Sequence, residues 1–152
     1  MTNERVLQTT KILLRLALGG AFLNAIADRL GLYGKYGTQW VSWGDWAHFL
    51  QSVAYLNWFV PKALIPTLGV VETIIEFSLG VALVAGSYQR IVAWASAALL
   101  FLFTLEMSIA LGIKAPMSYG VPTAFAAALL LGAVSVPNAV RAPAGSAHPD
   151  HD

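Results

Sequence analysis

The chain has 152 residues, 57% of them hydrophobic and 11% charged, with a formal net charge of +1. Soluble domains carry about 25% charged residues, so this composition, with a mean hydropathy of +0.65, predicts an integral membrane protein. The sequence holds no cysteine, which excludes thiol–disulfide chemistry, iron–sulfur ligation and thiolate metal sites. It has no basic patch, so we expect no nucleic-acid partner, and we predict no metal site.

The first apolar segment predicts a membrane-spanning helix over about residues 12–30, before Gly31 begins a turn. A cleavable signal peptide is the alternative, because the run Ala-Ile-Ala at 25–27 imitates a cleavage site. Arg15 interrupts the apolar core that such a peptide needs. We therefore favour a retained first helix.

An aromatic connection follows, from about residue 31 to residue 62. Trp and Tyr favour the headgroup region of a bilayer, where an apolar ring and a polar N–H or O–H are both accommodated. We therefore predict an interfacial or re-entrant segment over about residues 40–59 that covers one mouth of a bundle, with a short helix that starts near Asp45. An aromatic belt that only anchors the protein is the other interpretation. The Trp and Tyr residues of the connection are Trp40, Trp43, Trp46, Trp58, Tyr33, Tyr36 and Tyr55.

Three further apolar segments predict helices over about residues 63–85, 91–113 and 117–136. At 1.5 Å per residue, a helix of about 20 residues crosses a hydrocarbon core of about 30 Å. The expected fold is all-α: an integral membrane four-helix bundle, with the aromatic segment between its first and second helices. It forms a single domain over residues 1–136, and we expect a disordered polar tail at 137–152.

Four spans place both termini on one side of the membrane. The positive-inside rule does not choose the side, because the Lys and Arg residues outside the spans or at their ends divide four to four. They are Arg5, Lys11, Arg90 and Arg141 on one face and Arg29, Lys35, Lys62 and Lys114 on the other. The aromatic connection suits an outer cap, so we expect a multi-pass protein of the cell (inner) membrane with cytoplasmic termini.

Three carboxylates interrupt the apolar helices: Glu72 and Glu76 in the second and Glu106 in the third. A carboxyl group in hydrocarbon is costly, so such residues usually face a bundle interior, a partner or a water-filled cavity. We predict that these glutamates are the catalytic residues if the chain is an enzyme, which the sequence leaves open. Helix rise places two of them in one layer with Asn24 and Asp28, and the third about one turn deeper. Interhelical hydrogen bonding without a function is the alternative.

Seven further residues are predicted to bind a substrate or a quinone beside the carboxylates. Among them, Arg15 can either extend to the headgroups or reach inward to pair with Glu76. The three histidines lie outside the spanning segments, which argues against a membrane haem. The seven residues are Arg15, Asn24, Asp28, Arg29, Trp43, Trp46 and His48.

The segment from Leu14 to Phe22 carries an arginine followed by two glycines, and Glu76 opens a Gly-rich apolar run that ends at Arg90. These stretches resemble motifs of the DoxX/DoxD-like family, over about residues 12–136. The resemblance implies a small four-helix membrane protein in which Arg15 and the motif glutamate are functional positions. DoxD-like members are associated with thiosulfate:quinone oxidoreductase, so the resemblance also implies a quinone and a second subunit.

The favoured hypothesis is a membrane subunit of a quinone-linked oxidoreductase that oxidises thiosulfate or a related sulfur compound beside the buried carboxylates. Its quinone would be bound without a covalent link, and its partners would be the lipid bilayer and a second redox subunit. Two alternatives stay open: a non-catalytic membrane scaffold for a redox or stress-response partner, and a small proton-coupled transporter. The sequence also leaves a homo-oligomer open.

Overall fold

The computed structural model describes residues 3–135, so the tail predicted to be disordered at 137–152 lies outside the described residues. Within that range every regular element is a helix, which confirms the predicted all-α class. The elements are α1 (Asn3–Arg29), α2 (Trp46–Leu56), a 3₁₀ turn η1 (Lys62–Leu64), α3 (Ile65–Ala85), α4 (Gln89–Leu111), α5 (Lys114–Ser118) and α6 (Val121–Val134).

Three helical segments are long and apolar enough to cross a membrane: Asn3–Arg29, Lys62–Ala85 and Gln89–Leu111. The chain is therefore a multi-pass membrane protein. The fourth predicted span differs, because α6 has 14 residues and rises only about 21 Å, less than a hydrocarbon core of about 30 Å. The helix predicted at 117–136 is instead divided between α5 and α6.

Backbone chemistry explains the break between α5 and α6. Gly120 has a left-handed φ of 69°, which glycine adopts far more readily than other residues. Pro122, which has no N–H to donate, lies in the first turn of α6. Helix α1, in contrast, is longer than predicted. It starts at Asn3 rather than at residue 12, because Glu, Arg, Leu, Gln and Lys in its first turns are good helix formers.

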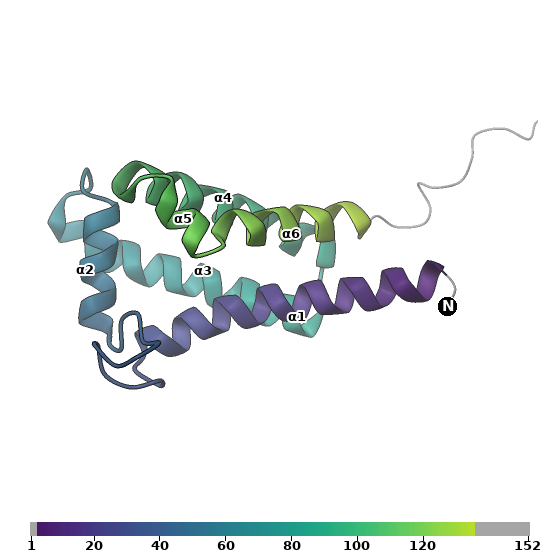
Figure 1. The fold of residues 1–152 in the computed structure, drawn as a ribbon, viewed down its shortest axis with the longest axis horizontal. Coiled ribbons are helices and arrows are strands. Elements are labelled where there is room, and N and C mark those ends of the chain that lie inside the picture. Colours follow the sequence, from purple (N-terminus) through teal and green to yellow (C-terminus); the bar gives the residue numbers. More distant parts are fainter. Residues whose placement is uncertain (1–2, 136–152) are drawn as a thin grey trace, which may run out of the picture.

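The long helices form two antiparallel pairs, visible in Figure 1 as α1 with α3 and α4 with α6. Small residues allow each pair to pack closely. A Cβ atom added at Gly19 of α1 would lie 2.9 Å from the carbonyl oxygen of Gly80 in α3. In the second pair, Gly132 of α6 lies against the indole ring of Trp94 in α4. Packing between the two pairs is less extensive, so a seam runs between them.

Apolar side chains are buried in two separate cores. The larger core lies among the four long helices, and the smaller core lies beneath α2. The larger core comprises Leu18, Phe22, Leu83, Val92, Ala93, Ala97, Leu100, Ala128 and Leu131, and the smaller one comprises Phe49, Val53 and Ile65.

Helix α2 lies across the end of the bundle at which α1 ends and α3 begins (Figure 1). The prediction of a short helix starting near Asp45 is confirmed, since the Asp45 side chain accepts a hydrogen bond from the backbone N–H of His48 and caps α2. The helix was expected to continue to about residue 59, the end of the predicted interfacial segment, but it ends at Leu56. Its interfacial or re-entrant position in a bilayer stays a prediction.

Candidate functional site

A buried ion pair joins α1 to α3 between the two apolar cores. The Arg29 Nη2 atom donates a hydrogen bond to Glu76 Oε2 at 2.7 Å, and the two side chains are 1% and 4% exposed. Arg29 Nη1 also donates to Thr73 Oγ1 at 2.8 Å. The Thr73 hydroxyl donates in turn to the Gly69 carbonyl at 2.8 Å, so its oxygen is oriented to accept from the guanidinium.

Helix direction explains why these two charged groups meet. The Cα–Cβ bonds of a helix are inclined toward its N-terminus. Because α1 and α3 are antiparallel, the side chains of Arg29 and Glu76 are inclined toward each other along the bundle. Arg29 is the last residue of α1, yet its guanidinium is therefore directed into the bundle.

Two aromatic rings from the segment after α1 shield the guanidinium. Its Cζ atom lies 4.0 Å from the ring centre of Phe49 and 5.2 Å from that of Trp43. Cation–π contacts of this kind are stronger when the cation is desolvated. The Nε atom of Arg29 is buried and has no hydrogen-bond partner within residues 3–135, so the guanidinium makes its hydrogen bonds through its two Nη atoms.

Two more carboxylates lie beside the ion pair. Glu72, one turn before Glu76 on α3, is half-buried and close enough to interact electrostatically with Arg29, Glu76 and Glu106. Glu106 of α4 is also half-buried, and the side chain of Asn57, just after α2, faces its carboxyl group. The three predicted glutamates thus lie near one another at the seam between the helix pairs, and Glu76 is the one that bonds Arg29.

Asp28, which was predicted to bind a substrate or a quinone, is bonded to the aromatic connection in the structure. Its carboxylate accepts hydrogen bonds from the backbone N–H groups of Ser42, Trp43 and Gly44, at 2.8, 3.3 and 3.3 Å. These bonds fold the aromatic connection back onto the end of α1. Asp28 is therefore a positioning residue that places Trp43 over the neighbouring Arg29.

The aromatic residues predicted as binders hold α2 in place. Trp43 Nε1 donates to Ser52 Oγ at 3.0 Å, and Trp46 packs on Phe49 with ring centres 5.1 Å apart. The His48 ring stacks on Tyr36 with ring centres 4.0 Å apart, and its Nδ1 bonds Asp45 Oδ2 at 2.7 Å. These contacts hold His48 to the aromatic connection and not to the three glutamates.

The backbone N–H and the ring of His48 both bond Asp45, and these bonds lower the pKa of Asp45 below its ordinary value of 3.8. The capping carboxylate is therefore ionised at neutral pH, as a helix N-terminus favours.

Of the two alternatives for Arg15, the structure does not form the inward pair with Glu76. Arg15 Nε and Nη2 donate to the carbonyl oxygens of Leu83 and Val84, at 2.8 and 2.9 Å. The last carbonyls of a helix lack partners within the helix and carry its negative dipole end, so they attract a guanidinium. Arg15 thus caps α3 at the end far from the carboxylates.

The predicted layer of polar residues is also divided. Asn24 is exposed and lies with Asp28 in a separate groove of about 400 Å³ under the aromatic connection. The sequence reasoning missed Thr73, Phe49 and Asn57. The position of Thr73, three residues before Glu76 and so on the same helix face, was the available signal for the first of them.

One protein family matches the chain. A family model described as "Methylamine utilisation protein MauE" matches residues 7–118. No curated protein and no solved structure matches the chain. The MauE match overturns the resemblance to the DoxX/DoxD-like family. The stretches that carried that resemblance are short runs of glycine and aliphatic residues, which transmembrane helices of many families use for close packing.

Proposed function

Because this chain belongs to the MauE family, we propose that it is a multi-pass membrane component of a methylamine utilisation system. We propose further that it acts through the buried cluster of Arg29, Glu72, Glu76 and Glu106 as an intramembrane site for a small cation. The observation that carries the proposal is the charge balance of the cluster, which holds three carboxylates and one guanidinium, the latter bonded to Glu76.

The ion pair and the flanking carboxylates have separate parts in this proposal. Arg29 and Glu76 bond each other and are buried from solvent, so they form the part of the site that does not itself bind the cation. Glu72 and Glu106 are half-buried and come from α3 and α4, on opposite sides of the seam. Two such carboxylates inside a membrane favour a cation or a proton.

Methylammonium, the protonated form of methylamine, has the chemistry that this site would recognise. Its N–H groups can donate to the oxygens of Glu72 and Glu106, and charge-assisted hydrogen bonds are the strong ones. Its methyl group is small enough to fit between packed helices.

Titration calorimetry of the detergent-purified protein with methylammonium chloride tests the site. We expect binding by the unmodified protein and a loss of more than about tenfold in Glu72→Gln and Glu106→Gln, because a hydrogen bond to a charged group contributes about 1.5–3 kcal/mol. Glu4→Gln is the matched control, since Glu4 is exposed in the first turn of α1. An equal loss in the control, or no binding by the unmodified protein, contradicts the proposal.

Growth tests membership in the pathway independently of the site. A strain in which the gene for this chain is deleted should lose growth on methylamine as sole nitrogen source and keep growth on ammonium. The unmodified gene should restore growth. Unimpaired growth of the deletion strain on methylamine contradicts the pathway assignment.

A quinone-linked oxidoreductase subunit is the second candidate, supported by the half-buried state of Glu72 and Glu106 between lipid-facing helices. Carboxylates there could exchange protons with a quinone, whose reduction takes up two protons. Thiosulfate as the electron donor was implied only by the DoxX/DoxD-like resemblance, which the MauE match overturns. Extraction of the purified protein should yield a quinone in this case, and a second redox subunit should co-purify. Quinone-free protein that binds methylammonium would exclude this candidate.

The membrane arrangement is part of the proposal. We propose that α5 and α6 together make the fourth crossing, with both termini cytoplasmic. Arg29 is buried in an ion pair and so leaves the count of loop charges. Among the described residues the remaining loop cations are Lys35, Lys62 and Lys114 at the α2 end and Arg5, Lys11 and Arg90 at the other. Arg141 follows the fourth crossing in the sequence and adds a fourth cation on the side of the termini, so the positive-inside rule favours cytoplasmic termini.

Labelling in intact cells tests this orientation, and the absence of native cysteine makes single introduced thiols unambiguous. An impermeant maleimide should label Lys35→Cys from outside and should label Arg5→Cys only after the cells are opened. The reverse pattern contradicts the orientation.

A further inference from the structure

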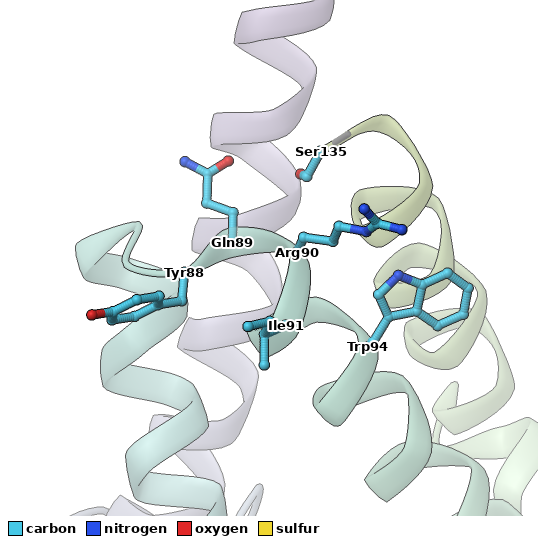
Figure 2. A pocket seen from close by; sticks show the side chains of 6 residues that line it. All are labelled: Tyr88, Gln89, Arg90, Ile91, Trp94 and Ser135. Carbon is cyan, nitrogen blue, oxygen red and sulfur yellow. The ribbon is translucent and has the colours of Figure 1, made fainter. Parts of the chain in front are cut away.

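A second cavity lies at the opposite end of the bundle, where the α3–α4 turn meets the end of α6. It has a volume of about 730 Å³ and is lined by Tyr88, Gln89, Arg90, Ile91, Trp94 and Ser135 (Figure 2). We propose that this cavity binds the headgroup of an anionic phospholipid. The proposal concerns a different place from the carboxylate cluster and does not depend on it.

The cavity presents one cation with no counter-charge. Arg90 is exposed and forms no ion pair or side-chain hydrogen bond with any residue in the described part of the chain. Figure 2 shows its side chain extending above the indole of Trp94. A planar guanidinium offers two parallel donors to a phosphate, so a phosphodiester fits this position.

The wall of the cavity is aromatic and aliphatic. Trp94 is 47% exposed and Ile91 is 70% exposed, and the Trp94 Nε1 edge faces Gly132 of α6. Tyr88 is 81% exposed with a left-handed φ of 44°, an unfavourable conformation for a bulky residue. Apolar surface beside a cation suits a lipid, with glycerol and acyl carbons, better than it suits free phosphate.

The cavity also lies at the right depth for a headgroup. α3 and α4 both span the membrane, and the turn that joins them, between Ala85 and Gln89, must reach the bilayer surface. Among the described residues this end of the bundle carries Arg5, Lys11, Arg15 and Arg90 against Glu4. Each cation near an anionic leaflet contributes about 1 kcal/mol of attraction, so the whole face favours anionic lipid.

Two further donors support the assignment. α4 has no side-chain N-cap, so the N–H groups of its first turn are available to an anion. Ser135 Oγ is buried beside the cavity and has no partner within residues 3–135.

Native mass spectrometry of the purified full-length protein tests the proposal, with equal amounts of phosphatidylglycerol and phosphatidylcholine added. We expect the unmodified protein to retain phosphatidylglycerol preferentially. Arg90→Gln should reduce that retention about fivefold, and Arg90→Lys should keep most of it. Lys114→Gln is the matched control, because Lys114 is an exposed cation at the start of α5, and it should bind as the unmodified protein does.

Three results overturn the proposal. One is equal retention of the two lipids by the unmodified protein, a measurement that needs no variant to fold. Another is the same loss in Arg90→Gln and Lys114→Gln, which would indicate general surface charge. The third is displacement of the lipid by excess inorganic phosphate, which would assign the cavity to free phosphate.

Discussion

Two arginines bond helix α1 to α3, Arg29 at the end of α1 and Arg15 at the end of α3, and the two work in opposite ways. Arg15 binds the carbonyl oxygens of Leu83 and Val84 at the end of α3. Arg29 is fully buried and bonds the carboxylate of Glu76. The same side chain thus caps a helix where it meets unsatisfied carbonyls, and forms an intramembrane ion pair where it meets a carboxylate.

The environment of each arginine determines how much the stability of the bundle depends on that side chain. Near Arg15 the helices are already in close contact through Gly19 and Gly80, and the larger apolar core lies alongside. At the other end, Arg29 lies between the two cores, where solvent does not reach its charge. Removing a partner from a buried pair leaves an uncompensated charge, so the α2 end should be the more sensitive one.

The largest expected effect follows from removing Arg29. Arg29→Met keeps much of the side-chain volume but leaves Glu76 buried without its cation. We expect a loss of about 3–5 kcal/mol in the free energy of unfolding, measured by denaturation of the protein in detergent. Trp43 and Phe49 should also become more accessible, because the cation beneath their rings is gone.

A double variant shows whether charge or packing is responsible. Arg29→Met combined with Glu76→Leu removes both charges together, and should recover most of the lost stability, because apolar replacement of a whole buried pair is often neutral. A double variant as unstable as Arg29→Met alone would show that the guanidinium acts through packing, and would contradict the ion-pair explanation.

A neighbouring pair of glycines tests close packing at the Arg15 end. In Gly19→Ala the new methyl carbon would lie 2.8 Å from Val84 Cγ2 and 2.9 Å from the Gly80 carbonyl oxygen, and a backbone oxygen cannot move aside cheaply. We expect destabilisation of about 1–3 kcal/mol in the same denaturation experiment.

Gly20→Ala is the control for that substitution. A Cβ atom there has no neighbour within 4 Å, so the variant should be neutral, or more stable by about 0.5–1 kcal/mol from helix propensity. Equal behaviour of the two alanine variants would mean that α1 and α3 do not depend on close approach at Gly19.

Removal of the Arg15 side chain should reduce the free energy of unfolding less than Arg29→Met or Gly19→Ala does. Arg15→Met loses two hydrogen bonds, but the freed carbonyls of α3 lie at the helix end, where water or headgroups can bond them. We expect a loss of about 1 kcal/mol. A loss as large as that of Arg29→Met would remove the contrast between the two ends.

The sequence predicts the spans and the polar interior well, because hydropathy and the cost of buried charge are local properties. The three helical spans follow from apolar runs, and the cap of α2 follows from Asp45 alone. Of the three glutamates expected inside the bundle, Glu76 is buried and Glu72 and Glu106 are half-buried. The break before α6 is marked locally by Gly120 and Pro122, but hydropathy alone does not show it, because the residues after Thr123 are almost all apolar and give one continuous apolar run.

Pairing within the cluster was not predictable by the same means. Depth along a helix places Arg15 within reach of Glu76, but depth says nothing of competing acceptors such as the last carbonyls of α3. Arg29 was predicted as a residue that binds a substrate or a quinone, and not as the partner of Glu76. The side chain of Arg29 is inclined toward the N-terminus of α1, so its guanidinium lies deeper in the bundle than its Cα atom. Residue positions along the helix do not show this inclination.

The smallest expected effect concerns the cap of α2. Asp45 accepts from the His48 backbone N–H at 2.9 Å and bonds the His48 ring at 2.7 Å, and these bonds lower the pKa of Asp45 below 3.8. Since the folded-state pKa lies below the unfolded one, the cap stabilises α2 fully above the ordinary value and is lost as the pH falls through the lowered value.

Hydrogen-exchange protection factors, which correct for intrinsic exchange rates, should therefore decrease in α2 relative to α3 below about pH 4. Asp45→Asn keeps a capping oxygen but cannot titrate, so the decrease specific to α2 should disappear in that variant. If α2 loses protection equally in both proteins, the acid sensitivity of this end belongs to another group, and Asp45 is only a neutral cap. If the loss follows Asp45, the α2 end holds two separable layers of electrostatics: an outer cap that responds to acid, and the sealed pair of Arg29 and Glu76 beneath it.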